Sequence, residues 1–84
     1  MSNVTVKLFA SLADYLPSGA KENTTSLKLP EAGTIGAVIE ELRVPEQRCH
    51  LVLLNGIFVP PARRTTTQIT DGDTIAIWPP VAGG

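Results

Sequence analysis

The sequence predicts an α+β domain in which a mixed sheet of four to five strands packs one main helix against one face. Residues 4–9 alternate between apolar and polar side chains, as a half-buried strand does. Residues 34–43 instead repeat their apolar side chains at helical spacing. Two turn signals, Asn55-Gly56 and residues 70–73, separate short apolar runs in the second half. With 84 residues, the chain is long enough for one domain with a single modest core.

Composition excludes several classes of protein. Apolar residues make up 43% and charged residues 18%, which is typical of a globular domain rather than a disordered chain. The net charge of −1 offers no footprint for nucleic acid, and we expect the basic doublet Arg63-Arg64 to lie in a solvated loop. No run approaches the ~20 apolar residues of a membrane span, and no secretion signal follows Met1. We therefore expect no membrane partner. The single cysteine, Cys49, cannot form an internal disulfide, so we expect a cytoplasmic protein.

The first third of the chain predicts two strands joined through a turn. Residues 4–9 (VTVKLF) place their three aliphatic side chains toward the core, while the aromatic Phe9 falls on the solvent-facing side. Residues 11–16 favour a short helical turn with Ser11 as its N-cap, ended by residues 17–19. Residues 25–29 suit a second strand.

The middle of the chain predicts the main helix, which begins at Thr34 and runs to about Arg43. Its end is set by Val44, because a residue before proline disfavours helical backbone. The side chains expected to form the buried stripe are Ile35, Val38, Ile39 and Leu42.

The last third predicts a hairpin and a final strand. Residues 51–54 (LVLL) form a continuous apolar run, short enough for a buried strand, and Asn55-Gly56 then favours a tight turn. The return strand, residues 57–59, is cut off by two prolines. In the final strand, residues 74–78, the two isoleucines point inward and Trp78 points outward.

This order of elements is the β-grasp (ubiquitin-like) pattern over residues 1–78, with the first and last strands parallel at the centre of the sheet. Phe9 and Trp78 are then expected on the same open face, and Phe58 can join them from the hairpin. Exposed aromatic clusters mark partner surfaces, so we favour docking over scattered surface residues or a cluster capped by the 11–16 turn.

No set of side chains predicts catalysis or a metal site. Cys49 and His50 are adjacent, so on a strand they point to opposite faces and cannot act as a nucleophile and its base. We expect Cys49 to be a small buried residue and His50 to be exposed. Asp71 and Asp73 are explained by turn chemistry.

The last six residues, 79–84 (PPVAGG), predict a flexible C-terminal tail. Its prolines end strand pairing, and Gly83-Gly84 has no Cβ, so another protein can thread the tail and reach the Gly84 carboxylate. The alternative is a frayed end or a leftover linker. A carboxylate must first be activated, most simply as an acyl-adenylate made by a separate ATP-using enzyme. The activated carbonyl then accepts sulfur to give a thiocarboxylate, or a lysine amine to give an isopeptide bond.

These residues resemble a known group. Val6 to Ala10 (VKLFA), residues 53–56 (LLNG), and above all residues 71–84 (DGDTIAIWPPVAGG) are similar to the β-grasp sulfur carriers. The closest resemblance is to the small subunit of molybdopterin synthase and the thiamine-pathway sulfur carrier. It covers nearly the whole chain.

The resemblance implies a co-substrate that is not an enzyme on its own and binds no cofactor itself. A ubiquitin-activating-like adenylating enzyme uses ATP and magnesium on Gly84, and a sulfurtransferase supplies the sulfur. The large synthase subunit then takes the tail into its active site, where two thiocarboxylate transfers build the molybdopterin dithiolene. The residues implied in partner contact are Phe9, Phe58, Trp78, Pro79, Pro80, Val81 and Ala82, with Gly83 and Gly84 at the reactive end.

Departures from the family leave other functions open. Trp78 stands where the family usually has Phe, residues 43–50 are shorter than in many synthase subunits, and residues 60–64 are unusual. The acceptor can instead be a thiamine thiazole precursor, a transfer RNA base or a tungsten cofactor precursor. A ubiquitin-like modifier joined to lysines through Gly84 is a second class, and a plain interaction domain is a third.

Overall fold

The computed structural model of the chain describes residues 2–18, 20–30 and 33–80. Its elements follow the predicted order of two strands, a helix and three further strands, with three short 3₁₀ turns between them. Within these ranges no helix has the length and apolar character needed to span a membrane. The elements are β1 (Ser2–Leu8), η1 (Ala10–Tyr15), β2 (Thr24–Leu29), α1 (Ile35–Glu41), η2 (Glu46–Arg48), β3 (Leu51–Leu54), β4 (Ile57–Phe58), η3 (Pro61–Arg63) and β5 (Thr74–Trp78).

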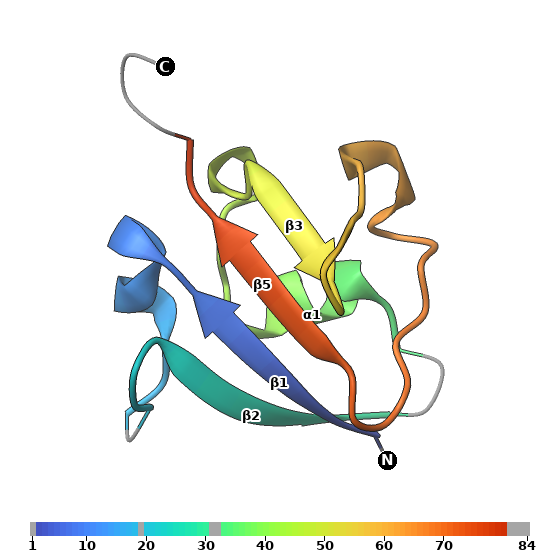
Figure 1. Ribbon diagram of the computed structural model, residues 1–84, viewed down its shortest axis with the longest axis horizontal. Helices are drawn as coiled ribbons and strands as arrows, with labels where there is room; N and C mark the ends of the chain where they lie inside the picture. The colour runs from blue at the N-terminus through green and yellow to red at the C-terminus, as the bar shows by residue number, and fades with distance from the viewer. Residues whose placement is uncertain (1, 19, 31–32, 81–84) are drawn as a thin grey trace.

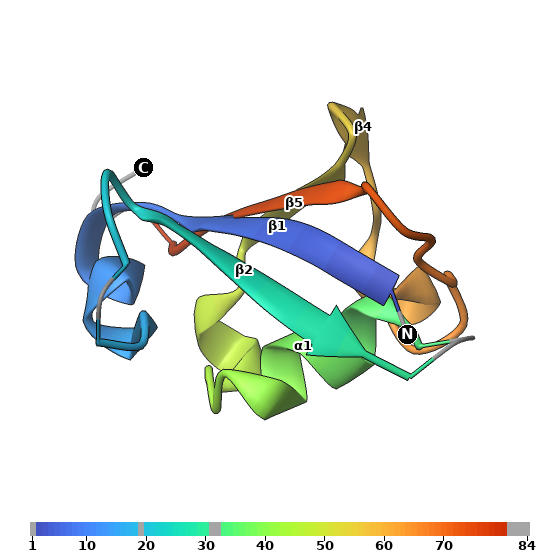
Figure 2. The same ribbon diagram turned by 90° about the horizontal axis from the view of Figure 1, so that it is seen from below.

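The five strands form one mixed sheet in the order β2-β1-β5-β3-β4. The central strands β1 and β5 run parallel, and every other neighbouring pair is antiparallel (Figure 1). The helix α1 lies on one face of this sheet only, as Figure 2 shows. The predicted β-grasp fold is therefore confirmed, including the parallel pairing of the first and last strands.

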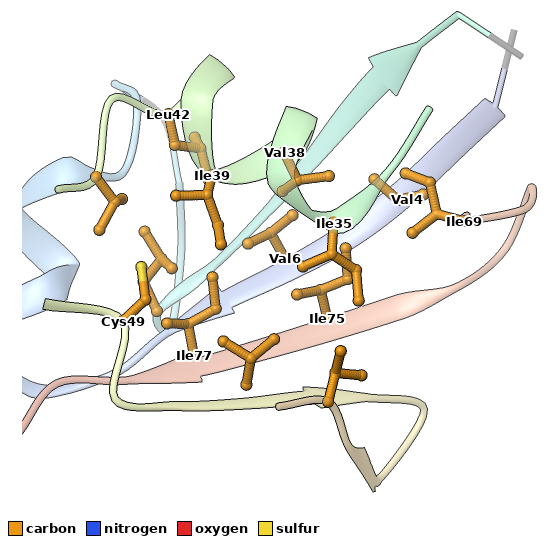
Figure 3. Close-up of a cluster of buried hydrophobic side chains, with 14 of the residues drawn as sticks. Val4, Val6, Ile35, Val38, Ile39, Leu42, Cys49, Ile69, Ile75 and Ile77 are labelled. Carbon is orange, nitrogen blue, oxygen red and sulfur yellow. The ribbon is translucent and has the colours of Figure 1, made fainter. Parts of the chain in front are cut away.

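The core fills the space between α1 and the covered face of the sheet (Figure 3). The inward side chains of β1 and β5 are fully buried, as their alternation predicts. The predicted helix stripe is also buried, at 0–8% exposure. Its four members are Ile35, Val38, Ile39 and Leu42.

The helix begins where predicted and ends slightly earlier. Thr34 is its N-cap, and its Oγ1 accepts a hydrogen bond of 3.2 Å from the backbone N–H of Ala37. The last helical residue is Glu41, and Arg43 has a φ of +60°, which takes the chain out of the helix two residues before Pro45.

The turn after β1 corrects one expectation, because Ser11 is not its N-cap. The N-cap is Phe9, which makes no side-chain cap, and the Ser11 hydroxyl instead accepts a hydrogen bond from Arg48. The turn buries Leu12 in the core and lies on the α1 side of the sheet (Figure 2). It closes one end of the core and leaves the opposite face of the sheet open.

Arg64 corrects a second expectation, that the basic doublet is solvated. Arg63 is exposed, but only 3% of Arg64 is accessible. Its guanidinium donates hydrogen bonds to three backbone carbonyls, those of Cys49 at 2.7 Å, His50 at 3.3 Å and Val59 at 3.4 Å. Arg64 therefore ties the start of β3 to the segment after β4.

Candidate functional site

The face of the sheet opposite α1 is the candidate site, and strand register defines its members. Residues directly opposite each other in a ladder share a face. Lys7 lies opposite Ala76, Ala76 opposite Leu53, and Leu53 opposite Phe58. We call the apolar part of this surface the open apolar face, and its members are Phe9, Leu51, Leu53, Phe58, Ala76 and Trp78.

Phe9 and Trp78 form the aromatic end of this surface. Their ring centroids are 4.4 Å apart and the ring planes differ by 4°, a stacked pair. The Phe9 backbone N–H donates to the carbonyl of Ile77, which holds the residue after β1 against the end of β5. Because β1 and β5 are parallel neighbours, the residues at their carboxyl ends lie side by side at the same end of the sheet. The predicted proximity of the two aromatics is confirmed.

Phe58 lies on the same face but farther along it. It is 52% exposed, and its neighbour Ile57 is 71% exposed. Figure 2 shows β4 rising away from the sheet on the side opposite α1. Leu53 and Leu51 bridge the space in register between Phe58 and Trp78, so the three predicted aromatics belong to one surface.

Sequence reasoning missed Leu51 and Leu53. It took residues 51–54 as a uniformly buried run, whereas the register buries Val52 completely and leaves Leu51 and Leu53 half-buried on the open face. The available signal was the lack of alternation: a strand that is apolar on both faces, in a sheet with one helix, must present half its side chains on the uncovered face.

The tail begins at the edge of this surface. The carbonyl of Trp78 accepts a 2.9 Å hydrogen bond from the N–H of His50, Pro79 is buried and Pro80 is exposed. The predicted tail residues Val81, Ala82, Gly83 and Gly84 lie outside the described residues. The described chain thus leads from the stacked Phe9–Trp78 pair directly into the tail.

Comparison with known proteins places this arrangement in a family. The profile of the ThiS family matches residues 6–84. The chain belongs to the ThiS family. This ThiS-family domain is a small β-grasp carrier protein, of the kind that includes sulfur carriers and small modifiers. Among curated protein sequences, none matches it.

Solved structures agree on the fold across the whole ThiS-family domain. The small archaeal modifier protein 1 from Methanosarcina acetivorans is 26% identical with a TM-score of 0.69, covering 100% of this chain and 98% of its own. SAMP1 from Haloferax volcanii is 25% identical with a TM-score of 0.69, covering 99% and 100%. The complex of subunits 1 and 2 of molybdopterin-converting factor from Helicobacter pylori contains a chain that is 23% identical, with a TM-score of 0.59, covering 98% and 99%.

Three ionisable residues of the ThiS-family domain, Cys49, Asp71 and Asp73, make hydrogen bonds within the fold. Within residues 2–18, 20–30 and 33–80, no three His, Cys, Asp or Glu side chains gather to hold a metal ion. Cys49 is buried, and its thiol donates to the carbonyl of Pro45 at 3.6 Å. Burial raises the pKa of this thiol, with Arg64 opposing the rise and Glu46 adding to it. His50 is exposed, so both predictions for the Cys49-His50 pair are confirmed.

The two aspartates complete a turn, as predicted. Asp73 accepts hydrogen bonds from the Thr70 backbone at 2.7 Å and from the Asn55 amide at 2.9 Å. These bonds lower the pKa of the Asp73 carboxyl. Asp71 accepts from the backbone N–H of Asn3 at 2.7 Å. The carboxylates therefore pin the turn to the ends of β1 and the hairpin.

Proposed function

We propose that this ThiS-family chain is the sulfur carrier that forms the small subunit of molybdopterin synthase, with Gly84 as its reactive residue. The observation that carries the proposal is that the PPVAGG tail follows directly after Trp78, which stacks on Phe9. This sequence joins the proposed docking surface to the proposed reactive arm. The proposal takes residues 1–78 as the docking domain and residues 79–84 as the arm, with buried Pro79 at its base.

The proposed chemistry takes place at the Gly84 carboxylate. Its oxygen attacks the α-phosphorus of ATP in the adenylating enzyme, and pyrophosphate leaves. A persulfide on the sulfurtransferase then attacks the activated carbonyl and displaces AMP, and a second thiol reduces the resulting acyl disulfide to release the thiocarboxylate. In the large synthase subunit two such thiocarboxylates each donate one sulfur to build the molybdopterin dithiolene, and water takes the acyl group so that the Gly84 carboxylate is restored. The partner enzyme, not the carrier, holds ATP and magnesium.

In this proposal the sheet face binds the partner and the tail carries the reactive carboxylate. The open apolar face supplies the buried area that a specific partner contact needs, with aromatic side chains that are enriched at such contacts. Four residues follow Pro80, and a fully extended chain of four spans at most about 14 Å. Docking therefore sets how deep the Gly84 carboxylate can enter a partner's active site.

Three partners are proposed: the adenylating enzyme, the sulfurtransferase and the large synthase subunit. The Helicobacter pylori protein of this fold, solved as a complex of subunits 1 and 2 of molybdopterin-converting factor, supports the last of these. The proposed location is the cytoplasm, where a lone cysteine such as Cys49 stays reduced.

The test is the intact mass of the protein after co-expression with the adenylating enzyme and the sulfurtransferase. We expect the mass to rise by the difference between one sulfur and one oxygen atom. Two matched controls lack the free Gly84 carboxylate, one by deletion of Gly84 and one by an alanine added after it. Both controls should fold as the parent does and keep their unmodified mass. Sulfur incorporation in either control would contradict the proposal, as would a Gly84 deletion that still supports dithiolene formation.

A protein modifier is the second candidate, favoured by the 26% and 25% identity to the two archaeal modifier proteins. In this case the activated Gly84 carbonyl accepts a lysine amine. Isopeptide-linked conjugates, identified by mass spectrometry and lost in both controls, would place this function first if no thiocarboxylate forms. If thiocarboxylate forms without dithiolene synthesis, assays with a thiazole precursor, a transfer RNA and a tungsten cofactor precursor distinguish the remaining acceptors.

A further inference from the structure

The open face of the sheet carries positive charge only. Among the strand side chains that share this face, the charged ones are Lys7 and Lys28, and both are exposed. No carboxylate belongs to the set, although the whole chain has a net charge of −1. The set, read from the register of the five described strands, is Asn3, Thr5, Lys7, Thr24, Ser26, Lys28, Leu51, Leu53, Phe58, Thr74, Ala76 and Trp78.

The carboxylates of the described strands and helices lie elsewhere. Glu40 and Glu41 are exposed on α1, and Glu46 is exposed on η2. Asp71 and Asp73 are engaged in the turn before β5. The strand side chains of the open face are therefore cationic only, whereas the exposed carboxylates of α1 and η2 stand beside the exposed Arg43 and Arg48.

Lys7 borders the open apolar face, whereas Lys28 is remote from it. Lys7 lies opposite Ala76 and precedes Phe9 by two residues, which places it on the same side of the strand as the aromatic pair. Lys28 lies opposite Asn3 on the edge strand, four strand positions or about 13 Å from the level of Lys7. A partner seated on the apolar residues thus covers Lys7 and not Lys28.

We propose that the adenylating enzyme presents an apolar seat flanked by a carboxylate, and that this carboxylate pairs with Lys7. The inference rests on the proposed function. A partner that covers the open apolar face brings its own rim against the Lys7 ammonium, and facing charges at the rim of a specific contact are of opposite sign. A second copy docked face to face does not provide this carboxylate, because the strand side chains of the open face include none.

The experiment measures the association rate of the intact chain with its cognate adenylating enzyme at low and high salt. Lys7→Glu is compared with Lys28→Glu, which makes the same charge change on the same face, and with Lys7→Gln. We expect Lys7→Glu to slow association by roughly tenfold at low salt and Lys7→Gln by less, because rim charges act mainly on the association rate. The Lys28→Glu rate should stay within about twofold of the parent. Melting temperatures check that all variants are folded, and high salt should shrink the Lys7 effect.

Each other outcome overturns the inference in a recognisable way. Equal effects of Lys7→Glu and Lys28→Glu would indicate general attraction without a specific pair. If Lys7→Glu associates as fast as the parent while Trp78→Ala binds the enzyme weakly, the enzyme has no carboxylate opposite Lys7. The proposed function would stand in that case. A parent protein that the enzyme neither binds nor adenylates would remove the proposed function, and this inference with it. Self-association of the parent through this face would assign it to a second copy.

Discussion

Trp78 and Ile77 are neighbours on β5, and truncation should mainly weaken partner binding at Trp78 and mainly lower stability at Ile77. Ile77 points into the core with 0% exposure, and Trp78 stacks on Phe9 at the open face. Ile77→Ala removes a fully buried side chain and leaves a cavity, which costs about 2–5 kcal/mol of the free energy of unfolding. Trp78→Ala removes a stacked pair, a contribution of about 0.5–1.5 kcal/mol beyond its area. Ile39→Ala should match Ile77→Ala, because Ile39 is 7% exposed.

The melting temperature converts these energies into a measurement. For a domain of this size, each kcal/mol moves the melting temperature by about 4–8 °C. Ile77→Ala should therefore lower it by about 8 °C or more, and Trp78→Ala by less, because Trp78 is only partly buried. Far-ultraviolet circular dichroism is the appropriate probe, because Trp78 is the sole tryptophan and its removal abolishes the fluorescence signal. Binding to the adenylating enzyme should fall strongly for Trp78→Ala.

A double-mutant cycle with Phe9→Ala isolates the stacking energy. The coupling between the two rings should be about 0.5–1.5 kcal/mol. If the melting temperature of Trp78→Ala fell as far as that of Ile77→Ala, Trp78 would be a core residue and its role in docking would be refuted. Unchanged partner binding by Trp78→Ala would also refute its role in docking.

Three further predictions concern the rest of the fold. Arg64→Met leaves three buried carbonyls without their hydrogen-bond donor and should lower the free energy of unfolding by about 1–3 kcal/mol, measured by urea denaturation. The control Arg63→Met should have little effect on the free energy of unfolding. The hydrogen bonds to Asp73 lower the pKa of its carboxyl below the ordinary 3.8, so they stabilise the fold above that pH. This stabilisation is lost as the pH falls through the folded-state pKa of Asp73. The urea midpoint of Asp73→Asn should therefore fall less in acid than the urea midpoint of the parent. The buried Cys49 thiol should react slowly with a thiol reagent until denaturant is added, and rapid reaction in the native protein would contradict its burial.

The fold was predictable because its signals are local. Alternation in residues 4–9, the Asn55-Gly56 turn and the helical stripe after Thr34 each act over a few residues, and their order restricts the topology to few choices. Arg64 was not predictable in this way. Its three carbonyl partners lie 5 to 15 residues away in the chain and converge only after β3, β4 and η3 are in place.

The candidate site was predictable in part, and the missed part explains its function better than the aromatics alone. Phe9 and Trp78 stood out because each breaks an alternating pattern, while Leu51 and Leu53 were hidden in a run with no pattern to break. A buried strand and a strand awaiting a partner have the same apolar composition, because both end up covered on two faces. In this sheet Val52 is fully buried on one face of β3, so the second apolar face of that strand is consistent with cover supplied by another protein.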